Sequence, residues 1–151
     1  MRDDGTGSAS NVISGLNAAV VQARVTGRPS VISMSLQFPP SPSIDNAVCF
    51  SLLTNNTSRT LTCVPQVSGA IGQGIPVIVG AGNNQQDANN FSPSRVVGAI
   101  TVGATTIDDT FASFSNFGEK IDILAPGQDI LSASNLDDHA NDTLSGTSVA
   151  V

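Results

Sequence analysis

The hydrophobic residues of this chain fall into segments whose spacing differs. Over residues 8–26 they recur at steps of three and four, which is the spacing of one helix face, and Gly27 and Pro29 follow where that pattern stops. Weaker patterns of the same period predict helices over residues 44–53 and 64–71. The apolar positions of the first helix are Val12, Leu16, Ala19, Val20 and Ala23.

Short apolar runs separate these helices. Residues 75–81 are apolar on both faces, residues 30–36 include β-branched side chains, and shorter runs cover residues 99–104 and 121–124. Runs of this kind are typical of strands in a parallel sheet that helices cover on both sides. The alternation of helix and strand therefore predicts an α/β domain.

Length and charge exclude several classes of protein. A chain of 151 residues suffices for one compact domain, and its net charge of −6 with six scattered Lys and Arg residues gives no basic face for nucleic acid. No apolar run approaches the roughly 18 residues of a membrane span. Residues 1–5 lack the apolar stretch of a signal peptide. We therefore expect an acidic globular domain that binds neither nucleic acid nor membrane.

Cys49 and Cys63 bracket a polar segment, and we interpret residues 49–63 as an inserted loop. If the protein is secreted, a disulfide between them would close this loop and stabilise the fold by about 3 kcal/mol in the chain-entropy model. Two free thiols are the alternative. Acceptor sequons for N-glycosylation favour an extracellular location. They begin at Asn55, Asn56, Asn90 and Asn141.

Two stretches carry candidate chemistry. Residues 80–84, Gly-Ala-Gly-Asn-Asn, follow a predicted strand, and loops at the carboxyl ends of parallel strands are where such sheets bind ligands. The side-chain amide of Asn83 suits the stabilisation of developing negative charge there. The stretch lacks the third glycine of a dinucleotide-binding loop, which argues against a nucleotide.

The second stretch is Ser-Gly-Thr-Ser-Val-Ala, residues 145–150. A serine in this setting suits the start of a helix, where free N–H groups favour an oxyanion beside the hydroxyl of Ser148. A turn or a helix cap without chemistry is the alternative interpretation, and this string alone does not separate the two.

Taken together, these stretches and the sequence between them resemble the subtilisin-like serine proteases, in particular the proteinase K-like branch. The similar motifs stand in the family's order and cover nearly the whole chain apart from residues 49–63. They are residues 3–7 with 12–16, 33–36, 80–83, 102–104, 112–118, 122–127 and 145–148. The resemblance implies a three-layer α/β subtilisin-like fold with a mostly parallel sheet, of which residues 1–151 are one part.

The resemblance also implies catalytic roles. Ser148 would be the nucleophile of a serine endopeptidase that works through an acyl-enzyme, and Asn83 would hold the oxyanion beside the Ser148 backbone N–H. The family's Asp and His belong upstream of Met1, and its serine-bearing helix continues past Val151, so we expect a partial catalytic domain. We interpret the single histidine, His139, as a solvated loop residue rather than a replacement base.

The same resemblance assigns a substrate groove. Where the family has glycines after the leucine of this motif, this chain has glutamine and phenylalanine, which predicts a narrower substrate fit. The residues that would line the extended groove are Ser35, Leu36 and Gln37, and those that would wall the primary pocket are Gly80, Ala81 and Gly82.

Relatives in this branch also suggest a structural Ca²⁺, here held by the Asp122 carboxylate and the carbonyls of Val97 and Ala99, all oxygen ligands that suit a hard cation. The alternative is that Asp122 only hydrogen-bonds its own loop. The substrates would be proteins or peptides, and the full-length form would be a secreted monomer. A catalytically inactive binding or scaffold module with the same fold is the competing function.

Overall fold

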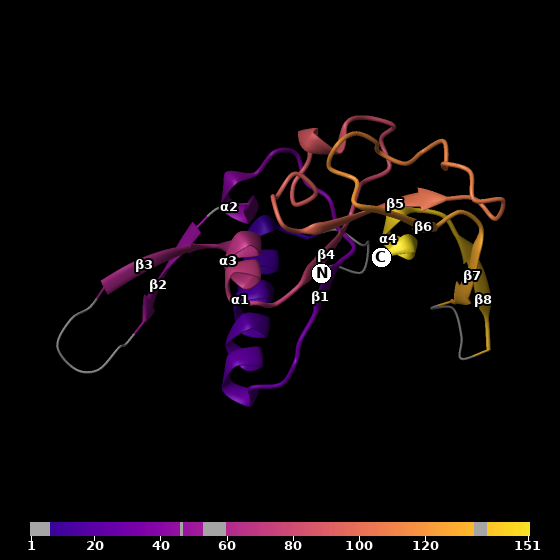
Figure 1. Cartoon of the computed structure of the whole chain (residues 1–151). Coiled ribbons are helices and arrows are strands. Elements are labelled where there is room, and N and C mark those ends of the chain that lie inside the picture. Colours follow the sequence, from indigo (N-terminus) through magenta and orange to yellow (C-terminus); the bar gives the residue numbers. More distant parts are fainter. Residues whose placement is uncertain (1–6, 46, 53–59, 135–138) are drawn as a thin grey trace.

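A parallel sheet with the strand order β1-β4-β5-β6 lies at the centre of the molecule (Figure 1). The computed structural model describes residues 7–45, 47–52, 60–134 and 139–151. The strands of this sheet are β1 (Ile32–Met34), β4 (Val77–Gly80), β5 (Ile100–Thr105) and β6 (Ile123–Pro126). Since all three pairings are parallel, the strands end at one edge of the sheet, and the segments after β1 and β4 follow adjacent strand ends.

Two helices pack against one face of this sheet. The helix α1 (Ala9–Thr26) begins at Ser8, whose side chain accepts a hydrogen bond from the Asn11 N–H, and ends at Gly27 in the left-handed conformation. The helix α3 is Gln66–Gly72. Both contribute to one hydrophobic core with the sheet. Its members on α1, α3 and β4 are Leu16, Val20, Val67, Ala70, Val77 and Val79.

The short helix α4 (Thr147–Ala150) lies on the other face. Successive residues of a strand point to opposite faces, so Gly80 faces away from the core that holds Val79. A methyl carbon on Gly80 would lie 3.1 Å from Thr147 Oγ1, which shows how closely α4 approaches β4. The α/β prediction is thereby confirmed, with helices on both faces of a parallel sheet.

Most predicted elements are present with shifted ends. The helix predicted over 8–26 is α1, the helix over 64–71 is α3, and the four predicted strands are β1, β4, β5 and β6. No end shifts by more than two residues; the last strand, for example, begins at Ile123 rather than at Ile121.

The helix predicted over residues 44–53 is wrong. Among the described residues of that range, only Ile44 and Asp45, the end of α2 (Pro42–Asp45), are helical, and β2 (Ala47–Leu52) pairs antiparallel with β3 (Thr60–Pro65). The segment 49–63, expected as a loop, is therefore largely a hairpin, and its tip, residues 53–59, lies outside the described residues. Pairing with a β-branched partner strand outweighs a weak helical period over so short a run. The register sets Cys49 directly opposite Cys63.

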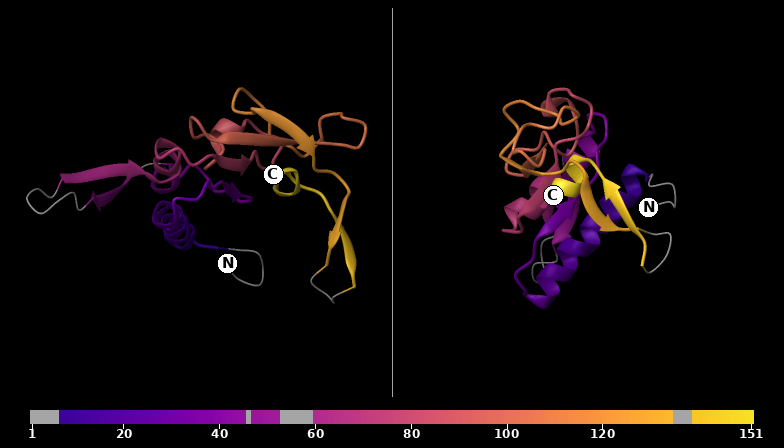
Figure 2. Two further views of the ribbon diagram at one scale, coloured as in Figure 1. Left: turned by 60° about the horizontal axis from the view of Figure 1, so that its bottom comes forward. Right: turned by 90° about the vertical axis from the view of Figure 1, so that its right-hand side faces the viewer.

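The sequence pattern does not predict a second hairpin that the structure contains. Strands β7 (Ile130–Ala133) and β8 (Asn141–Leu144) pair antiparallel, and β8 has a polar sequence that gives no strand pattern. Figure 2 shows that the two hairpins extend from the body of the molecule in different directions. The β7–β8 hairpin directly precedes α4 in the chain. The start of α4 lies at the edge of the sheet where β1 and β4 end.

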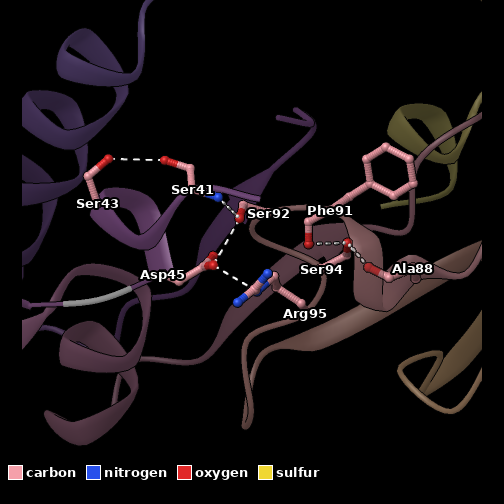
Figure 3. A network of polar contacts seen from close by, with 8 residues as sticks. All are labelled: Ser41, Ser43, Asp45, Ala88, Phe91, Ser92, Ser94 and Arg95. Carbon is pink, nitrogen blue, oxygen red and sulfur yellow. Dashed lines mark hydrogen bonds and ion pairs between the residues drawn. The ribbon is translucent and has the colours of Figure 1, made fainter. Parts of the chain in front are cut away.

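The segment after β1 is held by a polar network (Figure 3). Asp45 is 7% exposed, and its Oδ2 accepts a hydrogen bond from Ser92 Oγ at 2.9 Å and pairs with Arg95 Nε at 3.0 Å. Ser41 N donates to the same Ser92 hydroxyl at 2.8 Å. Phe38 and Ser92 also exchange two backbone hydrogen bonds. The chain that leaves β1 is thus fixed to the loop around residue 92.

Candidate active site

A cleft lies where β1, β4 and the start of α4 meet, with a volume of about 150 Å³. Three parts of the chain form it: the segment after β1, the segment after β4, and the first turn of α4. The fold thereby brings together three stretches that are far apart in the sequence, residues 35–37, 80–83 and 147–148. The lining residues are Ser35, Leu36, Gln37, Gly80, Gly82, Asn83, Thr147 and Ser148.

The hydroxyl of Ser148 and the amide of Asn83 lie close to one common point beside Gly146. A methyl carbon placed on Gly146 would lie 3.1 Å from Ser148 Oγ, 3.3 Å from Asn83 Nδ2 and 3.7 Å from Ser148 N. This space therefore adjoins one hydroxyl and two N–H donors. Such a set suits attack on a carbonyl carbon with the resulting oxyanion held by the donors.

The orientation of the Asn83 amide follows from its partner. Asn83 Oδ1 lies 2.9 Å from Thr147 N and 3.0 Å from Thr147 Oγ1. A backbone N–H only donates, so the side-chain oxygen must face Thr147 and the NH₂ group must point the other way, toward Ser148. Thr147 Oγ1 in turn accepts a hydrogen bond from Gly82 N at 3.0 Å.

Asn116 holds the loop that carries Asn83. It is fully buried, and its Oδ1 accepts hydrogen bonds from the backbone N–H groups of Asn84 and Gln86, each at 3.0 Å. Its Nδ2 donates to the Ala81 carbonyl at 2.9 Å, and its backbone N–H donates to the Gly82 carbonyl. One side chain therefore fixes the backbone on both sides of Asn83.

The residues expected to bind substrate occupy three different positions. Ser35, Leu36 and Gln37 line the cleft on the β1 side, and Ser35 Oγ donates to the Ser148 carbonyl at 3.0 Å. Gly80 and Gly82 line it on the β4 side. Ala81 is fully buried and does not line the cleft, because its side chain points into the protein; its carbonyl is bound by Asn116.

Sequence reasoning assigned no role to Thr147, Asn116 or Asn84. Thr147 and Asn116 lie inside motifs that carry the resemblance. Their hydrogen bonds, however, are made to residues 30 or more positions away in the chain. A single sequence holds no signal for such pairings, because side-chain hydrogen bonds of this kind have no local pattern.

The remaining predicted residues lie outside the cleft. Asp122 is exposed; its Oδ2 accepts from Thr101 N at 2.8 Å, and its own N–H donates to the Thr101 carbonyl. Val97 is exposed and Ala99 is buried. His139 is exposed between β7 and β8. Within the described part of the chain, no three His, Cys, Asp or Glu side chains form a group that could hold a metal.

Among the described residues, no helix combines the length and the apolar character needed to cross a bilayer.

Curated relatives are similar along almost the whole chain. The "Extracellular serine proteinase" of Thermus sp. (strain Rt41A) is 44% identical over 97% of this chain and 30% of that protein. "Subtilisin-like protease 2" of Pseudogymnoascus destructans is 41% identical over 97% of this chain and 32% of that protein. The chain thus spans about a third of their length.

A solved structure, "Crystal structure of a cold adapted subtilisin-like serine proteinase", superposes with a TM-score of 0.75 at 38% identity. The match covers 97% of this chain and 45% of that one, so the predicted subtilisin-like fold is confirmed for this part of the domain. The Subtilase family, Peptidase_S8, matches residues 1–151, and the chain belongs to that family.

Proposed function

We propose that this chain is part of a serine endopeptidase in which Ser148 is the nucleophile and Asn83 stabilises the oxyanion. The observation that carries the proposal is the convergence of Ser148 Oγ, Asn83 Nδ2 and Ser148 N on one space beside Gly146. Membership of the Subtilase family supports the same assignment. Since the chain spans about a third of its relatives, the activity belongs to the whole protein rather than to these residues alone.

The chemistry proceeds in two halves. Ser148 Oγ attacks the carbonyl carbon of a peptide bond and gives its proton to a base, and the carbonyl oxygen becomes an alkoxide. Asn83 NH₂ and Ser148 N–H donate hydrogen bonds to that alkoxide and lower the barrier. Collapse expels the amine, which takes up the proton, and leaves an acyl-enzyme ester on Ser148. Water then attacks the ester and releases the acid.

The general base and the carboxylate that orients it would come from outside these 151 residues. The single histidine of the sequence, His139, does not line the cleft. The substrates would be proteins or peptides whose backbone lies between the segment after β1 and the segment after β4. The name of the Thermus relative calls that protein extracellular, which supports secretion of the whole protein. We expect the whole protein to act as a monomer.

A chimera tests the proposal. Residues 7–151 replace the matching segment of the Thermus proteinase, and casein cleavage is compared with that of the Ser148→Ala variant. We expect cleavage by the chimera and none above background by the variant. A folded chimera that cleaves nothing would favour the competing function, an inactive binding or scaffold module.

A structural calcium ion is part of the proposal. Asp122 and Thr101 are joined by two hydrogen bonds, which hold the Asp122 carboxylate at Thr101, two residues after Ala99 and four after Val97 in the chain. A carboxylate and two carbonyls are the oxygen donors that Ca²⁺ prefers, so the donor chemistry fits. One carboxylate oxygen already accepts the Thr101 N–H, which leaves the other for the ion. Binding would raise the thermal midpoint of the chimera in Ca²⁺ relative to chelator, and Asp122→Ala would abolish that difference.

A further inference from the structure

The side chain of Gln37 lines the candidate cleft and bonds to the segment after β4. Gln37 follows β1 and is half-buried on the β1 side, yet its Nε2 donates a hydrogen bond to Asn84 Oδ1 on the β4 side. Asn84 is the residue directly after Asn83, and its own backbone is held by Asn116. The glutamine therefore links the segment after β1 to the segment after β4, between which a substrate would lie.

The carboxamide of Gln37 lies against the backbone of Gly82. A methyl carbon on Gly82 would be 2.5 Å from both Gln37 Oε1 and Asn116 Nδ2 and 2.7 Å from Gln37 Cδ, so these two side chains together leave no room for a side chain at position 82. Gly82 has φ +101°, a conformation that strongly favours glycine. The Gln37 carboxamide therefore takes up space directly beside Gly82, one of the residues assigned to the wall of the primary pocket.

Gln37 is held in this position from both ends. The next residue, Phe38, exchanges two backbone hydrogen bonds with Ser92, at 2.8 and 3.0 Å, and Ser92 is bound to Asp45. The far end of the side chain is bound to Asn84. A large substrate side chain would have to break the bond to Asn84 and leave a half-buried amide without that partner.

We propose that Gln37 is a specificity-determining residue that restricts the primary pocket to small substrate side chains. The inference rests on the proposed function, because it assigns the selectivity of that same cleft. Glutamine closes the pocket by its volume and by the hydrogen bond that keeps it there. The residue whose carbonyl Ser148 attacks would then be alanine or serine in preference to phenylalanine.

The test measures selectivity in the chimera that carries residues 7–151. The ratio of kcat/KM for peptide substrates with Phe and with Ala before the cut bond is determined for the chimera and for its Gln37→Ala variant. We expect the Phe/Ala ratio to rise about tenfold or more in Gln37→Ala, since one misfitting group in a pocket commonly changes selectivity by that factor. Gln22→Ala, on the exposed side of α1, is the matched control and should leave the ratio unchanged.

Each outcome bears on one of the two claims. An active chimera whose ratio is the same in Gln37→Ala overturns this inference and leaves the proposed function standing. A folded chimera that cleaves neither peptide and takes up no fluorophosphonate overturns the proposed function, and the inference with it. The reciprocal graft covers a chimera that fails to fold. The Thermus proteinase with Ser-Leu-Gln-Phe at the positions matching 35–38, and Asn at the position matching 84, should show a Phe/Ala ratio about tenfold lower; an unchanged ratio contradicts the inference.

Discussion

Thr147 directs both of its donors, the backbone N–H and the side-chain hydroxyl, to the same oxygen of Asn83, at 2.9 and 3.0 Å. The residue that precedes the nucleophile therefore sets the orientation of the oxyanion donor. Since Thr147 Oγ1 also accepts the Gly82 N–H, the hydroxyl is fixed as a donor toward Asn83. The first turn of α4 and the loop after β4 thus form one unit.

Replacing Thr147 with valine tests this relationship. Thr147→Val keeps the shape and the backbone donor but loses the hydroxyl, so Asn83 would be oriented by one hydrogen bond and not two. We expect kcat of the chimera to fall about tenfold with little change in KM, which corresponds to the loss of one ordinary hydrogen bond. Thr147→Ser keeps the hydroxyl, so this variant should retain most of the activity of the parent chimera. Equal losses in both variants would indicate a packing effect instead.

Removing the Asn83 donor should lower kcat more than the Thr147→Val substitution does. Asn83→Ala deletes the amide that faces Ser148, and the loss of such an asparagine in a subtilisin, a member of this family, lowers kcat by about 10²–10³. We expect a loss of that size here, a value borrowed from that relative. Asn83→Asp is the matched control for shape, because it retains the oxygen that Thr147 binds but lacks the donor, and it should be equally impaired. A kcat near that of the parent in either variant would argue against the assigned role.

Asn116 should matter for stability as well as activity. Asn116→Ala leaves the backbone N–H groups of Asn84 and Gln86 and the Ala81 carbonyl without their partner. An unsatisfied buried polar group costs about 1–3 kcal/mol, so we expect the chimera to lose at least about 2 kcal/mol in its free energy of unfolding. Chemical denaturation measures this. Asn89→Ala, at an exposed asparagine in the same region, is the control and should shift the midpoint little.

The sequence predicted the sheet and the candidate catalytic residues but not the contacts that position them. The apolar run of residues 75–81 alone is sufficient to predict β4, which covers Val77–Gly80 and has three of its four residues buried. The polar strand β8 carries no such pattern, and residues 44–53 carry a misleading one, because strand pairing depends on a partner elsewhere in the chain. Thr147, Asn116 and Gln37 act on backbone or side chains that only folding brings near.

The Cys49–Cys63 pair gives a fourth prediction. The register of β2 and β3 sets the two residues directly opposite one another, which is compatible with a disulfide. In protein secreted from eukaryotic cells, we expect neither cysteine to react with a thiol reagent until a reductant is added. Labelling of both cysteines without reductant would establish the alternative, two free thiols.

The central claim is that Ser148 is the nucleophile, and one labelling experiment tests it most directly. The chimera and the isolated chain of residues 1–151 are treated with a fluorophosphonate, digested and analysed by mass spectrometry. Ser148 should carry the phosphonyl group in the chimera, while the isolated chain, whose single histidine is outside the cleft, should remain unlabelled because serine without a base is a weak nucleophile. An active chimera that is modified at another serine, such as Ser145, or not at all, would contradict the assignment of Ser148.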